Sequence, residues 1–364
     1  MAMDPSIRAL LQKFGLDGPP PTAAPTVEQM RAGNRQLSLA VAPSPPLAVG
    51  SVAEDTLAGV PVRVYRPDTA GPTPTVLFIH GGGWILGDLD THDGVCRRLC
   101  RDLDAVVVSV DYRLAPEHPF PAAYDDCVGV AREVAAGIDR FGGGVLALAG
   151  DSAGANLAAA VALALRDDGT PVAAQLLAYP ATDLSGRTDF PSMTENATGY
   201  LLTADECRHD IQLYTGGDPS TTADPRVSPL LAADHRGLAP AVIGVGEHDP
   251  LRDHALAYAD ALAAAGVPVR RHVYPGLIHG FLNYDSVSPA VDTAVTQLYA
   301  EFGDFVRSAR PAFRPPARPV NQHPHGLGGP YRALRGTGPS LPDECPAGIT
   351  AGGCSPPAGP SGPA

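Results

Sequence analysis

The stretch Gly150-Asp151-Ser152-Ala153-Gly154 decides the fold of this chain, because it joins a short apolar run to a long run of small residues. The run before it, 145–149, is VLALA and predicts a buried parallel strand. The run after it, 155–166, is rich in Ala and Leu and predicts a buried helix. A G-x-S-x-G between a strand and a helix places the serine on a sharp turn, where its hydroxyl projects into a cleft. Ser152 is therefore the first candidate nucleophile.

The same pentapeptide has a simpler interpretation. A chain with 40 glycines can contain G-x-S-x-G by chance, and Asp151 or Ser152 could serve only to cap the following helix. A nucleophile needs a base, an acid and donors for an oxyanion elsewhere in the chain, whereas a helix cap needs none of these. The other motifs of the sequence therefore decide between the two interpretations.

Composition excludes several classes of protein. The chain has 364 residues, of which 44% are hydrophobic, enough for one large core or two modest ones. Its net charge is −13 and it has no basic block, which argues against a nucleic-acid partner. No apolar run reaches the roughly 18 residues of a membrane span, and the first residues do not resemble a secretory signal. We therefore expect a cytoplasmic protein without a membrane span.

The cysteines do not indicate a metal centre. Only Cys96 and Cys100 are close enough to face one another on a helix, and no second Cys or His pair completes a recognisable metal site. Free, buried thiols are the better interpretation. It applies to all six cysteines, which are Cys96, Cys100, Cys127, Cys207, Cys345 and Cys354.

Hydrophobic patterning divides the chain into a core and additions to it. Candidate helices at 5–14 and 26–37 precede the strands, so 1–45 is predicted to be an N-terminal cap element. Buried or alternating strand patterns and helices fill the core, 46–182 and 239–308. Residues 183–238 lose this alternation and predict an inserted cap segment with a helix at 203–214. Residues 311–364 hold 13 Pro and 10 Gly and predict a disordered tail. Residues 47–67 alternate as in half-buried antiparallel strands, most clearly at 60–66. The other predicted strands of the core lie at 75–79, 105–110, 145–149, 173–179, 241–245 and 269–274.

A second glycine-rich stretch, His80-Gly-Gly-Gly-Trp84, directly follows the predicted strand 75–79. Three glycines leave backbone N–H groups free to approach a ligand, although the same sequence could form a flexible turn. With a nucleophile on the next elbow, the loop would form half of an oxyanion hole, and the amides of Gly82, Gly83 and Ala153 are the predicted donors. Trp84, the only tryptophan, could line the cleft or simply pack in the core.

The base and the acid are sought at the carboxyl ends of later strands. Of eleven histidines, His279 is the one on a Gly-flanked loop just beyond the last predicted strand. Asp249 lies four residues past the strand 241–245 and is the candidate acid, with Asp253 as the weaker alternative. An imidazole held by a carboxylate suits the activation of a serine. The order Ser152, Asp249, His279 is that of the α/β-hydrolase fold.

These motifs together resemble the hormone-sensitive lipase family of bacterial carboxylesterases over about residues 1–308. The resemblance implies an α/β-hydrolase fold, with a mostly parallel eight-stranded sheet, flanking helices and a helical cap. It also implies hydrolysis of short- to medium-chain acyl esters without a cofactor or metal, and the possibility of a homodimer. The motifs that carry it are His80–Trp84, Asp111-Tyr-Arg-Leu-Ala-Pro-Glu117, Gly150–Gly154, Asp249-Pro-Leu-Arg-Asp253 and His279-Gly-Phe281.

Two other functions remain compatible with the fold. An amide deacetylase or a lactonase would use the same three residues, since the cap pocket decides the substrate. The other is a non-catalytic small-molecule receptor. Plant gibberellin receptors are an example, since they resemble this family but lack the catalytic histidine. The presence of His279 argues against a receptor. A serine carboxylesterase acting on a small-molecule ester is therefore the predicted function.

Overall fold

A single sheet organises the computed structural model, which describes residues 2–18 and 25–309. Among these residues, eight strands pair in the order β1-β2-β4-β3-β5-β6-β7-β8. The β1–β2 and β2–β4 pairs are antiparallel and all the others are parallel, which confirms the predicted mostly parallel sheet. The strands are β1 (Ser51–Leu57), β2 (Val60–Arg66), β3 (Thr73–Ile79), β4 (Val106–Val110), β5 (Gly143–Asp151), β6 (Gln175–Ala178), β7 (Ala241–His248) and β8 (Val269–Ile278).

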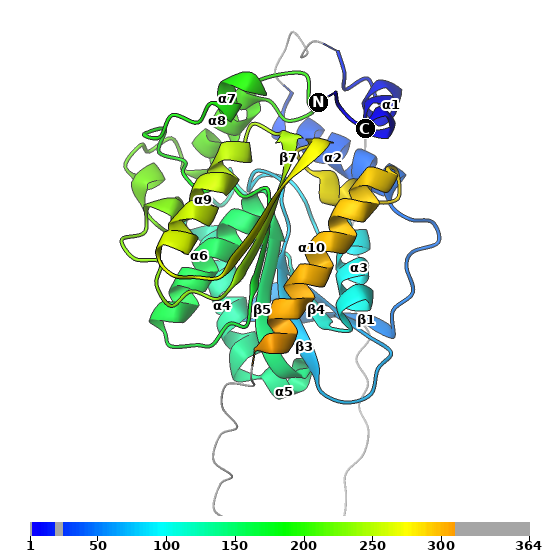
Figure 1. Ribbon diagram of the computed structural model, residues 1–364, viewed down its shortest axis with the longest axis vertical. Coiled ribbons are helices and arrows are strands. Elements are labelled where there is room, and N and C mark those ends of the chain that lie inside the picture. Colours follow the sequence, from blue (N-terminus) through cyan, green and yellow to red (C-terminus); the bar gives the residue numbers. More distant parts are fainter. Residues whose placement is uncertain (1, 19–24, 310–364) are drawn as a thin grey trace, which may run out of the picture. The chain divides into compact units, whose positions relative to one another are not determined.

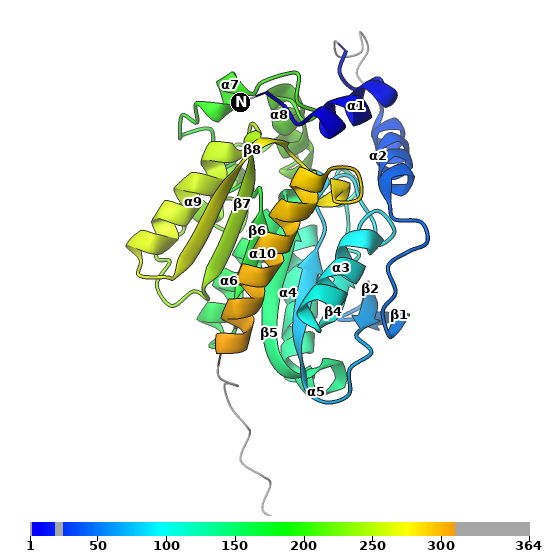
Figure 2. The same cartoon turned by 45° about the vertical axis from the view of Figure 1, so that its right-hand side comes forward.

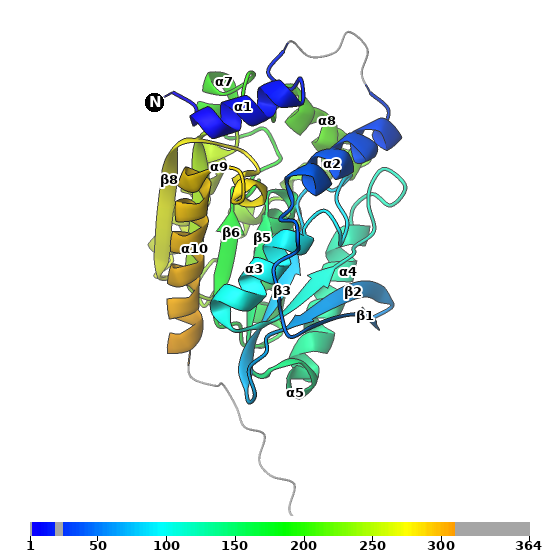
Figure 3. The ribbon, with the colours of Figure 1, turned by 90° about the vertical axis from the view of Figure 1, so that its right-hand side faces the viewer.

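Helices cover both faces of the sheet (Figures 2 and 3). One face carries α3 (Asp93–Leu103) and α10 (Pro289–Ser308), and the other carries α4 (Ala122–Ala136), α6 (Ala153–Asp167) and α9 (Arg252–Ala264). The short α5 (Ile138–Phe141) leads into β5. Burial on both faces explains why the central strands are mostly apolar, as in β4, where all five residues are buried and four of them are valines.

The remaining helices gather beyond the carboxyl ends of the strands (Figure 1). Two of them begin with a capping box, in which a threonine and the side chain three residues later bond each other's backbone: Thr26 with Gln29, and Thr203 with Glu206. These local signals fix where the polar segments become helical. The elements are α1 (Pro5–Lys13), α2 (Val27–Val41), α7 (Ser192–Glu195), α8 (Ala204–Tyr214), and the 3₁₀ turns η1 (Thr221–Ala223), η2 (Pro229–Leu231) and η3 (Phe281–Tyr284).

Most predicted elements agree with the structure, and the differences have local causes. The second N-terminal helix runs on to Val41 instead of ending near residue 37. Strand β5 includes Gly143 and Gly144, which were expected to lie before it, because Gly144 pairs so closely with β3 that a Cβ would lie 2.6 Å from the carbonyl oxygen of Thr73. Helix α6 begins at Ala153 and not at residue 155.

Two further expectations concern cysteines and membranes. Cys96, Cys100, Cys127 and Cys207 are free and buried, as predicted, whereas Cys345, Cys354 and the predicted tail at 311–364 lie outside the described residues. Across residues 2–18 and 25–309, the structure contains no helix of the length and apolar character that a bilayer crossing requires.

Candidate active site

Ser152 lies on a strained turn between β5 and α6. Its φ and ψ of 52° and −121° lie in a region that non-glycine residues avoid, which costs on the order of 1–3 kcal/mol. A hydrogen bond from its N–H to the carbonyl oxygen of Ala178, 2.8 Å long, helps hold this turn. The flanking glycines leave no room for side chains, since a Cβ on Gly154 would lie 2.0 Å from the carbonyl oxygen of Ile79, and one on Gly150 2.4 Å from the carbonyl oxygen of Gly154. The turn therefore directs the serine out of the sheet.

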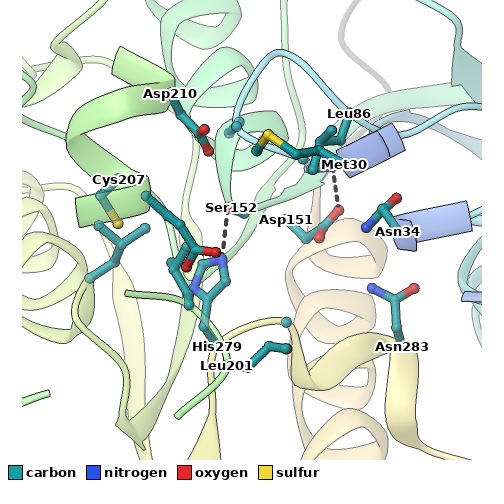
Figure 4. Close-up of a pocket in the computed structure, with 18 of the residues that line it drawn as sticks. Met30, Asn34, Leu86, Asp151, Ser152, Leu201, Cys207, Asp210, His279 and Asn283 are labelled. Carbon is teal, nitrogen blue, oxygen red and sulfur yellow. Dashed lines mark hydrogen bonds between the residues drawn. The ribbon is translucent and has the colours of Figure 1, made fainter. Parts of the chain in front are cut away.

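The structure brings the three residues predicted from the sequence into one hydrogen-bonded line. Oγ of Ser152 lies 2.8 Å from Nε2 of His279 (Figure 4). Nδ1 of the same imidazole lies 2.9 Å from Oδ2 of Asp249. A carboxylate only accepts, so Nδ1 of His279 donates to it and Nε2 accepts from the serine hydroxyl. This arrangement can remove the hydroxyl proton as the oxygen attacks a carbonyl.

Backbone and side-chain contacts hold the buried acid in place. The N–H of Leu251 donates to Oδ1 of Asp249 over 2.7 Å, and Nδ2 of Asn196 donates to the backbone oxygen of Asp249 over 3.0 Å. The other candidate acid points elsewhere, since Asp253 accepts from the N–H of Ser192 and pairs with Arg252. Of the two candidate acids, Asp249 is therefore the one that contacts the imidazole of His279.

The three residues predicted to supply oxyanion donors line the same cavity as Ser152. Gly82 and Gly83 have φ values of 120° and 59°, which favour glycine. Within the described residues, the N–H groups of Gly82, Gly83 and Ala153 donate to no protein acceptor. The loop is held by its neighbours, because Gly81 N–H donates to Asp151 Oδ1 over 2.8 Å. Three unpaired N–H groups beside a serine can receive the negative oxygen of a tetrahedral intermediate.

A buried polar cluster lies behind this loop. Oδ1 of Asp151 is 3.3 Å from Nε2 of His92, at ion-pair distance but without hydrogen-bond geometry. Burial alone would raise the pKa of Asp151, but His92 and the N–H of Gly81 outweigh burial and lower the pKa. His80 stacks on Tyr112 at 4.3 Å, and its burial lowers the imidazole pKa to about 4. The loop therefore rests on a neutral imidazole and an ionised carboxylate.

A cavity of about 520 Å³ opens onto Ser152. Its walls come from the residues just after α1, from α2, from the glycine loop, from the segment with α7 and α8, and from the η3 region. Figure 4 shows side chains from several of these walls around Ser152. Trp84 lines the cavity and also packs, since its ring stacks on Tyr214 at 4.5 Å, so both interpretations of this residue hold. The cavity is mostly apolar, with a few polar side chains that include Asn34, Asp210 and Asn283.

Asp210 is the functional candidate that sequence analysis missed. It is 8% exposed on the inner face of α8, and burial together with the negative charge of Glu206 raises its pKa to about 8. Helical spacing in the sequence could have indicated it, because Cys207, Asp210 and Tyr214 lie three and four residues apart and so share one face of the helix. An acid on the buried face of a helix indicates a site or a buried partner.

Comparisons with known proteins agree with this geometry. A family profile described as alpha/beta hydrolase fold matches residues 76–283, more than half of the chain. The chain belongs to the α/β-hydrolase family. Its resemblance to the hormone-sensitive lipase family of bacterial carboxylesterases is confirmed by this match and by the relatives described next.

Several relatives of this α/β hydrolase carry esterase names. It is 44% identical over 302 residues to carboxylesterase NlhH of Mycobacterium tuberculosis, covering 80% of this chain and 92% of that protein. It is 44% identical over 299 residues to carboxylic ester hydrolase LipN of the same organism, covering 77% of each chain. A solved structure of a hyperthermophilic esterase from the archaeon Pyrobaculum calidifontis is 38% identical, with a TM-score of 0.78 over 84% of this chain and 99% of that chain.

Proposed function

We propose that this α/β hydrolase is a serine carboxylesterase that cleaves short- to medium-chain acyl esters, with Ser152 as nucleophile, His279 as base and Asp249 as the supporting acid. The observation that carries the proposal is the hydrogen-bonded line from Asp249 through His279 to Ser152, which ends at the floor of a cavity. The esterase names of the relatives point to the same chemistry.

The reaction begins with attack of Ser152 Oγ on the ester carbonyl while Nε2 of His279 takes the hydroxyl proton. Asp249 stabilises the imidazolium that forms, and its burial strengthens this interaction because little water screens it. The imidazolium then protonates the leaving alcohol, which yields an acyl-enzyme. Water activated by His279 hydrolyses this intermediate and restores the serine.

The negative oxygen of each tetrahedral intermediate would lie among the N–H groups of Gly82, Gly83 and Ala153. Each such donor typically lowers the barrier by about 3 kcal/mol. The N-terminal element, 1–45, and the inserted segment, 183–238, would act as the cap, since side chains from both line the cavity above the serine.

The cavity volume supports small acyl and alcohol groups. About 520 Å³ accommodates a compact ester but few extended lipid chains. A relative from Pseudomonas putida, 38% identical over 249 residues, is named ethyl acetate hydrolase, a name that also indicates a small substrate.

The test is hydrolysis of p-nitrophenyl acyl esters from acetate to palmitate by the wild-type chain, by Ser152→Ala and by Ser308→Ala. Ser308 lies at the end of α10, where its hydroxyl donates to the backbone oxygen of Asp304 and, among residues 2–18 and 25–309, to no other group, so this variant is a matched control. We expect activity on short chains in the wild type and the control and a loss of at least about 10⁴-fold in Ser152→Ala.

Labelling with a fluorophosphonate separates the mechanism from the choice of substrate. A mass shift on the peptide that contains Ser152, together with inactivity toward all esters, would replace the ester by an amide or lactone substrate. Absence of both labelling and turnover would leave only a binding function for the site. Ester hydrolysis that survives Ser152→Ala would overturn the proposal.

A further inference from the structure

We propose that Asp210 recognises a hydrogen-bond-donating group on the substrate, so that the enzyme prefers esters that carry an ammonium or hydroxyl group to matched esters that carry a carboxylate. The inference rests on the proposed esterase function and adds to it the chemical class of the substrate. Asp210 is placed here as a specificity-determining residue, outside the line formed by Ser152, His279 and Asp249.

The first support is an unpaired buried carboxyl group. Asp210 lines the cavity and is only 8% exposed, and its Oδ1 has no hydrogen-bond partner within the described residues. Figure 4 shows the carboxyl group directed from α8 toward the interior of the pocket. Buried polar atoms are paired in the great majority of cases, because an unpaired one loses its hydration without compensation. A bound substrate is the partner that the position allows.

The second support is closeness to the reacting group. A Cβ on Gly83 would lie 2.0 Å from Oδ2 of Asp210, so the carboxyl group packs directly against the glycine loop. The N–H of Gly83 is one of the proposed oxyanion donors. An ester bound at Ser152 would therefore have its nearby substituents within reach of Asp210, and a donor on either the acyl or the alcohol side could contact it.

The third support is the sign of the charges around the cavity. Within the described part of the chain, no lysine or arginine lines it, while Glu206 lies one helical turn before Asp210 on the same wall. Burial and Glu206 already raise the pKa of Asp210 to about 8, because a negative charge is unfavourable there. A second negative charge from a substrate would be opposed for the same reason. A substrate ammonium would instead pair with the carboxylate and satisfy Oδ1.

The experiment uses two series of esters that differ in one group. Benzyl acetates with a 4-methyl, 4-hydroxymethyl, 4-aminomethyl or 4-carboxy substituent test the alcohol side, and ethyl phenylacetates with the same substituents test the acyl side. The values of kcat/KM are measured for the wild type, for Asp210→Asn and for Asp205→Asn. Asp205 carries the same charge on the same helix, but its side chain is 88% exposed and lies outside the cavity, so it is the matched control.

We expect the kcat/KM of the wild type to be roughly 100-fold higher for the aminomethyl ester than for the carboxy ester in at least one series, with the value for the hydroxymethyl ester between them. In Asp210→Asn this ratio should fall by at least about tenfold, and in Asp205→Asn it should not change. An unchanged ratio in Asp210→Asn, with active protein, would overturn the inference alone. Failure of the wild type to hydrolyse the methyl esters would instead overturn the proposed esterase function on which the inference rests.

Discussion

Oδ2 of Asp249 lies 2.9 Å from Nδ1 of His279, and Asp249 is fully shielded from solvent. This contact sets the tautomer of the imidazole and leaves Nε2 free to accept the proton of Ser152. Asp249→Asn should lower kcat by about 10⁴-fold, because an amide that donates to Nδ1 moves the histidine proton to Nε2. Steady-state kinetics with short acyl esters measures this loss.

Asp253→Asn is the matched control for this substitution. It removes a carboxylate four residues away that contacts Ser192 and Arg252 and not the imidazole. We expect its kcat to stay within about threefold of wild type. Equal losses in the two variants, with both proteins folded by circular dichroism, would contradict the role given to Asp249.

Replacing a glycine by alanine should have opposite effects on stability at a crowded position, Gly154, and at an open position, Gly33. Gly154→Ala should lower the free energy of unfolding by more than about 3 kcal/mol, because its Cβ would lie 2.0 Å from the backbone oxygen of Ile79 in the packed core. Gly33→Ala, inside α2 with nothing within 4 Å of the new Cβ, should raise it by about 0.5–1 kcal/mol through helix propensity. Urea unfolding measures both changes, and a neutral Gly154→Ala would show that the elbow can relax.

Arg31 attaches α2 to the rest of the molecule through an ion pair and two hydrogen bonds to backbone oxygens. Its guanidinium bonds both carboxylate oxygens of Glu117, at 2.8 and 2.7 Å, and also donates to the backbone oxygens of Ile85 and Ala115. Because both charged side chains are partly exposed, Glu117→Gln should cost less than about 1 kcal/mol. Arg31→Met should cost about 2 kcal/mol, since it also leaves two carbonyl oxygens without their donor.

The same pair bears on substrate binding, because Met30, Gly33 and Asn34 of α2 line the cavity. Arg31→Met should therefore raise KM for short esters several-fold, while Glu117→Gln should change it little. Comparing unfolding free energies and KM for the two variants and the double mutant tests this asymmetry. Equal effects of the two single substitutions would show that Arg31 acts only through its ion pair with Glu117 and that its bonds to the two carbonyl oxygens contribute nothing.

The core of this fold was predictable because its signals are local. Apolar runs such as 75–79 and 241–245 are followed within a few residues by glycines or an acid. The strand, the turn and the candidate functional residue therefore lie within about ten residues of one another, where sequence patterns can reveal them. The arrangement of α1, α2 and α8 over the cavity depends instead on contacts such as that of Arg31 with Glu117, which are 86 residues apart. Asp210 was missed for the same reason. Its carboxyl group packs against the glycine loop at Gly83, which is far away in the sequence, and the spacing of residues within its own helix does not reveal that contact.

His254 should make the protein less stable in acid. Burial lowers its pKa to about 4 in the folded state, against an ordinary histidine value of 6.5. Between these two values the unfolded chain binds a proton that the folded chain does not, so stability falls as the pH decreases from about 6.5 to about 4. The expected loss is on the order of 1–3 kcal/mol for one such group. His254→Asn should flatten this part of the stability curve, while His209→Asn, at an exposed position of α8, should not.

Asp210 should destabilise the folded protein at neutral and alkaline pH. Its folded pKa of about 8 is above the ordinary aspartate value of 3.8, so between these values the folded chain holds a proton that the unfolded chain has released. Stability therefore falls as the pH rises through this window and levels off above about 8. Asp210→Asn removes the titration and should raise the free energy of unfolding by up to about 5 kcal/mol at pH 8, with little gain near pH 4.

Urea unfolding at pH 5, 6.5 and 8 measures this difference, with Asp205→Asn as the exposed control on the same helix. If the free energy of unfolding of Asp210→Asn exceeds that of the wild type by an amount that grows with pH, while Asp205→Asn shows no such growth, then burial of the Asp210 carboxyl group lowers stability. A constant difference across the three pH values would mean that Asp210 is already ionised in the folded state. Suppose that Asp210→Asn shows this pH-dependent gain in unfolding free energy and also loses selectivity for ammonium esters. Asp210 would then weaken the fold while serving substrate recognition, as expected of a residue retained for function.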